Sequence, residues 1–194
     1  MPGKYASFAE LASHEFEGVD YRVNAIERPQ SRVLILAPHG GTIEVGTSEI
    51  ATLIAGDEHS FFAFEGLKPH GRNRELHITS HHFDHPACLA LAFRCEVAVS
   101  VHGCKGDACV FVGGLETGLA ALLADHIAAS GFRVVTEGHR YPGRHPLNIC
   151  NRTTRGRGAQ LEITHDLRGS QRRVSLAHAA RAAIAAYVQR EGQA

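Results

Sequence analysis

Two histidines that each follow an apolar run are the residues of this sequence best suited to chemistry. His39 comes after the run 33–37, and His102 comes after the run 97–101. Each run is typical of a buried strand, and the glycine after each histidine indicates a tight turn. Ligands of open α/β sheets bind at the carboxyl ends of strands. If the two strands are neighbours, both imidazoles lie at that edge.

Glu44 adds a carboxylate five residues after His39. His and Glu are zinc ligands, and a catalytic zinc site uses three protein ligands and leaves one position open. With His102 the sequence offers a His–Glu–His set for Zn²⁺, which would activate a water molecule as the nucleophile at neutral pH. This spacing of His and Glu also arises by chance. The alternative is that each histidine packs or caps at a strand end.

Glu162 is the candidate general base. It lies in the short strand-like run 160–163, where a carboxylate is costly to bury without a role. A carboxylate beside a metal-activated water can take its proton and pass it to a leaving amine. The alternative is an outward-facing residue on a half-exposed strand.

Two polar loops carry cations that could hold an anionic substrate. A guanidinium binds carboxylate in a bidentate manner, and an Asn amide adds a directional hydrogen bond. The first loop also contains Lys68, and the second also contains Arg155 and Arg157. The alternative for any single arginine is a solvated side chain. The candidates for substrate binding are Arg72 and Arg74 in the first loop, and Asn148, Asn151 and Arg152 in the second.

A cysteine nucleophile is the alternative chemistry. Cys104 lies close to His102, and Cys150 lies in the arginine-rich loop, so a Cys–His pair is chemically possible. We expect His102 to be poorly placed to activate Cys104, because positions at one strand end point in different directions. The five cysteines form no C-x-x-C pair, which favours reduced thiols in the cytoplasm.

The composition excludes several classes of function. The 20 Lys and Arg residues balance the 20 Asp and Glu residues, and a net charge of zero argues against nucleic acid as the main partner. No apolar stretch has membrane-spanning length, and the first residues lack the apolar segment of a signal peptide. We therefore expect a single cytoplasmic domain over residues 1–194, monomeric and without a membrane partner.

Strand-like and helix-like segments alternate along the chain. This order predicts an α/β fold with one open, mixed and largely parallel sheet flanked by helices. Segment 137–158 shows no periodicity, and a loop of that length is typical of function. The expected helices cover 7–14, 47–55, the segment from an Asp84 cap to Arg94, 115–129 and 177–189. The expected strands cover 21–26, 33–37, 60–64, 75–79, 97–101, 109–112, 132–135 and 160–163.

Seven short motifs, in order, resemble the poly-γ-glutamate hydrolase family of the phage-associated type. Each motif alone is weak, but seven in the family's order are specific. They cover most of the chain, from about Val33 to Ile163. The motifs are 39–44 with 46–50, 64–66, 76–80, 99–103, 112–115, 148–151 and 160–163.

The resemblance implies a zinc-dependent peptidase whose open α/β core is distantly similar to the zinc carboxypeptidases. Such an enzyme cleaves the γ-glutamyl amide bonds of poly-γ-glutamate, a bacterial capsule polymer. His39, Glu44 and His102 would then be the zinc ligands. Glu162 would be the catalytic carboxylate. Asn151–Arg152 is similar to the Asn–Arg pair that binds substrate in the carboxypeptidases.

Departures from the family lie in segment 80–85, which is rich in histidine, and in the arginine-rich loop. They leave the expected zinc set untouched and bear on the substrate. The expected substrate is an anionic γ-glutamyl polymer or peptide, met after lysis if the chain derives from a phage. Two alternatives stay open, namely a zinc deacylase of a small N-acylated amino acid and a non-catalytic binder of anionic polymers.

Overall fold

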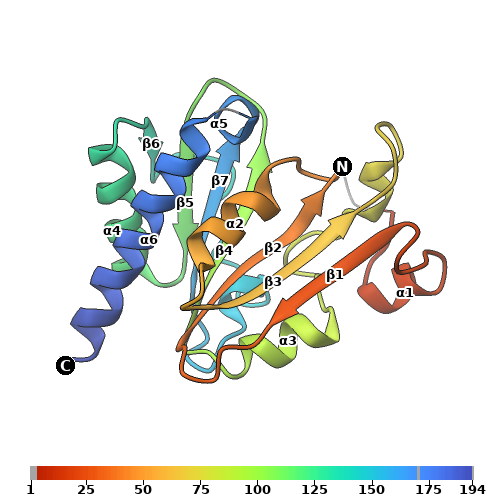
Figure 1. Cartoon of the computed structure of the whole chain (residues 1–194), viewed down its shortest axis with the longest axis horizontal. Helices are drawn as coiled ribbons and strands as arrows, with labels where there is room; N and C mark the ends of the chain where they lie inside the picture. Colours follow the sequence, from red (N-terminus) through yellow and green to blue (C-terminus); the bar gives the residue numbers. More distant parts are fainter. Residues whose placement is uncertain (1–3, 170, 194) are drawn as a thin grey trace.

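A seven-stranded sheet forms the centre of the computed structural model, which describes residues 4–169 and 171–193. The strand order is β1-β3-β2-β4-β7-β5-β6 (Figure 1). β1/β3 and β5/β7 are antiparallel and the other four neighbouring pairs are parallel, which confirms the predicted mixed, largely parallel sheet. The strands are β1 (Tyr21–Ile26), β2 (Val33–Gly41), β3 (Ser60–Gly66), β4 (Val97–Cys104), β5 (Val110–Gly114), β6 (Val134–Val135) and β7 (Ala159–Thr164).

Helices cover both faces of the sheet (Figure 1). Since side chains alternate along a strand, Ile35 packs under one set of helices and Leu36 under the other. Burial on both faces explains the continuous apolar runs of β2 and β4. One face carries α2 (Thr47–Ala55), α4 (Thr117–Ala129) and α6 (Arg172–Glu191), and the other carries α1 (Phe8–Ala12) and α3 (Pro86–Ala92). Within the described residues, no helix is both long enough and apolar enough to cross a bilayer.

The local structure differs from the sequence predictions in several places. The expected strand at 75–79 is a 3-10 helix, η1 (Asn73–Leu76), followed by an irregular segment. Its Glu75 pairs with Lys68 at 3.0 Å and with Arg72 at 3.2 Å. The segment 137–158 also contains a turn of 3-10 helix, η2 (Ile149–Asn151).

The N-cap of α3 is His85, not Asp84. The Nδ1 atom of His85 accepts the backbone N–H of Ala87 at 3.2 Å. Asp84 instead accepts the backbone N–H of Phe8 at 2.6 Å and so holds α1 against the sheet. A short helix, α5 (His165–Gly169), was not predicted, and α6 begins five residues earlier than expected.

Candidate active site

His102 and Glu162 lie beside each other on neighbouring strands. β4 and β7 pair in parallel, with His102 opposite Glu162 in the register. The flanking Val101, Leu161 and Ile163 belong to the core under α2, α4 and α6. Alternation along each strand therefore places His102 and Glu162 together on the other face. Both are buried, so the alternative of a half-exposed Glu162 is excluded.

A bulge in β2 turns His39 to the same face. Alternation from Ile35 and Ala37 would point His39 toward α2, but the β2/β3 register shifts between Ala37 and Gly40. Bulges commonly re-aim a side chain in this way. The His39 ring lies edge-on to Phe83, and its Nε2–H donates to the carbonyl of Ile78 at 2.7 Å. Because this donation fixes the proton on Nε2, the lone pair of Nδ1 is directed into the site.

Glu44 joins the two histidines from the turn between β2 and α2. Its Oε1 lies 3.4 Å from Nδ1 of His39, and its Oε2 lies 3.9 Å from Nδ1 of His102. The two Nδ1 atoms are 3.2 Å apart. Two ligand atoms on one tetrahedral zinc ion are roughly 3.3 Å apart, given bonds of about 2.0–2.1 Å. The separations of His39 from His102 and from Glu44 therefore match those of zinc ligands, while the 3.9 Å between Glu44 and His102 is longer and involves the other carboxylate oxygen.

The donor chemistry also fits a cation. Two neutral imidazoles can share one proton between facing Nδ1 atoms, whereas a metal ion satisfies both lone pairs and the carboxylate. Among the described residues, Nε2 of His102 is buried without a hydrogen-bond partner. The backbone N–H of Gly103 donates to Oε2 of Glu44 at 2.7 Å, which holds the carboxylate in place.

His77 is a further donor that the sequence analysis missed. Its Nε2 lies 3.9 Å from Oε1 of Glu44, and its ring stacks on that of His39 with centroids 4.0 Å apart. His39, Glu44 and His77 each offer a ligand atom within 4.8 Å of the others. The available signal was the motif 76–80, whose histidine received no role because the segment was interpreted as a strand.

The electrostatics of the cluster favour the metal-binding forms of Glu44, His102 and His77, whereas a metal ion at His39 would have to displace a proton. Burial would raise the pKa of Glu44, but His39, His102 and the Gly103 N–H outweigh it and lower that pKa to about 2. Burial and the nearby His39 lower the pKa of His102 to about 3. His39 and burial together lower the pKa of His77 to about 3. Burial opposes a charge on His39, but Glu44 overcomes it and raises the pKa of His39. At neutral pH, Glu44 is therefore charged while His102 and His77 are neutral.

Glu162 has the environment of a proton acceptor. Burial, followed by repulsion from Glu44, raises its pKa to about 8. Nε2 of Gln160 donates to its Oε1 at 3.2 Å, and Nδ2 of Asn148 donates to Oε1 of Gln160 at 2.8 Å. Asn148 therefore reaches the carboxylate through Gln160. A carboxyl group that titrates near neutrality is suited to taking up and returning a proton.

The thiol alternative fails for a different reason than the sequence suggested. β4 extends through Cys104, so His102 and Cys104 are two residues apart on one strand and share a face. The expectation that they point in different directions was wrong. However, burial, with Glu162 as a further cause, raises the pKa of Cys104 to about 12. A neutral thiol at physiological pH is a poor nucleophile.

The side chain of Asn151, a predicted substrate-binding residue, is hydrogen-bonded to backbone groups. Its Nδ2 donates to the carbonyls of Gly143 and His145 at 2.8 and 3.0 Å. Its Oδ1 accepts the N–H groups of Gly158 at 3.0 Å and Leu115 at 3.4 Å. The side chain is buried and holds the loop 137–158 against β5 and β7. Its role in substrate binding stays a prediction.

The predicted cations contact residues other than Glu162. Arg152 lies over the ring of Phe93, at the end of α3. Arg72 is exposed and pairs with Glu75, and Arg74 is exposed. Lys68 is buried between Glu15 and Glu75, which gives it a structural role. Substrate binding by Arg72, Arg74 and Arg152 stays a prediction.

Two other arginines act on Glu162 and were not singled out from the sequence. The charges of Arg168 and Arg140 both oppose the rise in the pKa of Glu162. Arg140 is exposed, and its Nε donates to the hydroxyl of Tyr141 at 3.0 Å. The Tyr141 ring packs on Phe111, which lies opposite Glu162 in the β5/β7 register. The aperiodic loop was the available signal for Arg140.

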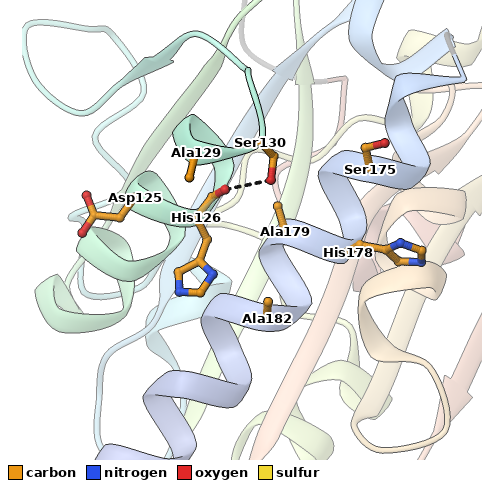
Figure 2. A pocket seen from close by; sticks show the side chains of 8 residues that line it. All are labelled: Asp125, His126, Ala129, Ser130, Ser175, His178, Ala179 and Ala182. Atoms are coloured by element: carbon orange, nitrogen blue, oxygen red, sulfur yellow. Dashed lines mark hydrogen bonds between the residues drawn. The ribbon is translucent and has the colours of Figure 1, made fainter.

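A groove of about 670 Å³ lies between α4 and α6, on the other face of the sheet (Figure 2). Its walls are mostly small side chains, and Figure 2 shows the hydroxyl of Ser130 donating to the carbonyl of His126. None of the candidate ligands lines it. The lining residues are Asp125, His126, Ala129, Ser130, Ser175, His178, Ala179 and Ala182.

Comparison with known sequences identifies related proteins. Residues 5–189 match the family described as poly-gamma-glutamate hydrolase. Two relatives from Bacillus subtilis (strain 168) are YndL, 40% identical over 169 residues, and the SPbeta prophage-derived YoqZ, 38% identical over 168 residues. These alignments cover 86% and 85% of this chain. The chain spans less than two thirds of either relative, namely 66% of YndL and 60% of YoqZ.

Solved structures share the fold. A bacteriophage poly-gamma-glutamate hydrolase matches with a TM-score of 0.89 and 32% identity, over 96% of this chain and 99% of that one. A zinc-free form of YNDL matches with a TM-score of 0.84 and 32% identity, over 94% and 97%. A protein from Shewanella denitrificans OS-217 assigned as a carboxypeptidase A matches at 0.53 and 17%, over 88% and 61%. The last likeness confirms the predicted carboxypeptidase-like core as a fold.

Proposed function

Because the chain belongs to the poly-γ-glutamate hydrolase family, we propose that it is a zinc-dependent hydrolase of γ-glutamyl amide bonds. The observation that carries this proposal is the convergence of His39, Glu44 and His102 at ligand spacing beside a buried Glu162. In this proposal the first three residues hold the metal. Glu162 is the base, and His77 completes the wall of the site.

Each residue of the proposed site has a separate role. A bound zinc ion supplies a Lewis acid and acidifies water. The Ile78 carbonyl fixes the tautomer of His39, and the Gly103 N–H fixes Glu44. Glu162 takes a proton from water at a carboxylate oxygen and returns it to the leaving nitrogen, while Gln160 orients that carboxylate.

The proposed substrate presents negative charge close to the reacting bond. Each γ-linked glutamate carries a free α-carboxylate on the carbon next to the amide nitrogen. Arg140 is an exposed guanidinium whose charge reaches Glu162, so it is suited to that carboxylate. Asn148, Asn151, Arg152, Arg72 and Arg74 stay candidates for binding further units.

Metal analysis and product analysis together test the proposal. The purified protein should contain one zinc ion per chain and should shorten poly-γ-glutamate, and a chelator should stop the reaction. Activity on N-acyl amino acids but not on γ-glutamyl amides would favour the deacylase. Binding of the polymer without cleavage would favour the non-catalytic binder. Full activity after removal of zinc would contradict the proposal.

A further inference from the structure

Arg168 on α5 lies behind the candidate site and is buried. Its Nε donates to the carbonyl of Ile163 at 3.0 Å, and its Nη1 donates to the carbonyl of Val45. Ile163 directly follows Glu162, and Val45 directly follows Glu44. One guanidinium therefore joins the backbone segments that carry the two carboxylates.

The same guanidinium also packs against the backbone of the third strand of the site. A Cβ atom at Gly103 would lie 2.5 Å from Cζ of Arg168, so a larger residue there would have to displace the guanidinium. Gly103 directly follows His102, and its N–H holds Glu44. Arg168 thus contacts the residue after Glu44, after His102 and after Glu162.

This placement carries an energetic cost. A buried guanidinium loses hydration, and burial accordingly lowers the pKa of Arg168. Within the described residues its hydrogen-bond partners are carbonyl oxygens, and no carboxylate lies within ion-pairing distance. Glu44 is its strongest favourable electrostatic neighbour. A buried charge of this kind indicates a role beyond packing.

We propose that Arg168 is a positioning residue, which locks the backbone behind Glu44, His102 and Glu162 into one unit. The three side chains then keep the mutual separations that zinc binding and proton transfer need. The activity readouts of this inference rest on the whole of the proposed function, whereas its zinc-retention readout rests only on the zinc site and not on the substrate or the reaction. Residues behind metal ligands typically change metal affinity or activity by about 10–100-fold when replaced.

The test compares Arg168→Met with Arg181→Met. Arg181 is a matched control because its guanidinium also lies against a glycine, Gly56, but pairs with Glu58 at a distant, half-exposed position. Zinc loss to a chelator, kcat and KM are measured for each. Arg168→Met should lose zinc about 10–100-fold faster, or show a kcat lower by that factor, with KM little changed. Arg181→Met should behave like the wild type.

Two further experiments separate positioning from simple instability. Gly103→Ala keeps the arginine but pushes the guanidinium away, and it should reproduce the zinc loss. Added methylguanidinium should partly restore zinc retention and kcat to Arg168→Ala, which a merely unstable protein would not show. Zinc retention and kcat within about twofold of the wild type in both Arg168→Met and Gly103→Ala would overturn the inference. A wild type that retains zinc but cleaves no γ-glutamyl amide would instead overturn the proposed function, and the zinc readout would still test Arg168.

Discussion

Four side chains surround the candidate metal position, and their individual roles can be separated. His102 faces His39 at 3.2 Å, whereas His77 stacks on His39 and approaches Glu44 at 3.9 Å. His77 also lies within reach of this position, because its ligand atom lies within 4.8 Å of those of His39 and Glu44. His102 is the third ligand that the sequence predicts, and His77 is the alternative third ligand that the spacing allows.

Single replacements should show this difference. His102→Ala should abolish stoichiometric zinc, because three ligands leave no spare. His77→Ala should keep zinc, because His77 is not one of the three proposed ligands. It should lower activity, because it removes a wall of the site. Metal content after dialysis checks both, with the exposed His82 replaced by Ala as the control. Loss of zinc from His77→Ala with retention in His102→Ala would reverse the assignment.

Replacing Glu162 by Gln should remove the base and keep the metal. The amide preserves shape and hydrogen bonding but accepts no proton at neutral pH. Turnover should fall by about 10²–10⁴-fold, which is the usual contribution of general acid–base catalysis. Zinc content should not change. Turnover within a few-fold of the wild type would show that another group takes the proton.

The same replacement should stabilise the metal-free protein at high pH. The pKa of Glu162 is raised to about 8 in the folded state, so folding favours its protonated form. Its contribution to stability is complete below the unfolded pKa and is lost as pH rises through about 8. Metal-free Glu162→Gln should therefore exceed the wild type in free energy of unfolding at pH 9, and match it near pH 4. Denaturant unfolding at both pH values measures this, and equal stabilities at pH 9 would contradict the raised pKa.

At the scale of elements, the sequence predicted strands correctly where a strand is buried on both faces of the sheet. The apolar runs before His39 and His102 predicted β2 and β4, and neighbouring strands bring both rings to one edge. Contacts between segments far apart in the chain could not be predicted from the local pattern of residues. Asp84 accepts the backbone N–H of Phe8 and therefore does not cap α3. The bulge in β2 lies in its pairing with β3. Arg168 was missed because α5 is five residues long and shows no periodicity.

The loop 137–158 illustrates this limit, since its predicted function rested on its length and on the types of its Asn and Arg residues, which do not show what those side chains contact. Asn151 uses both of its side-chain atoms to hold the loop's backbone. Asn151→Ala should therefore lower the free energy of unfolding by at least about 2 kcal/mol, because it leaves several buried backbone groups unpaired. Arg152→Ala should have little effect on stability. Thermal unfolding compares the two variants, and an unchanged Asn151→Ala with a raised KM would instead support the substrate role.

At the scale of the whole molecule, the balanced charge simplifies the kinetics. With 20 cationic and 20 anionic side chains, the chain has no net charge that would attract an anionic polymer from a distance. Any dependence of KM on salt must then come from local contacts, which lose strength as the Debye length falls to about 10 Å at 0.1 M ionic strength. Salt can therefore be used to locate the cation that binds the substrate.

Arg140 and Arg152 give different expectations in such an experiment. Arg140 is exposed and its charge reaches Glu162, whereas Arg152 lies over Phe93. Arg140→Ala should raise KM for an anionic γ-glutamyl substrate, leave KM for a neutral amide analogue unchanged, and flatten the salt dependence. Arg152→Ala should raise KM for the charged substrate less than Arg140→Ala does, because Arg152 lies over Phe93 and would bind only a further unit of the polymer. If Arg152→Ala alone raises KM for the charged substrate, the Asn–Arg pair suggested by the sequence binds the carboxylate. Equal losses on both substrates for Arg140→Ala would mean that Arg140 holds the Tyr141 loop in place and makes no contact with the substrate's charge.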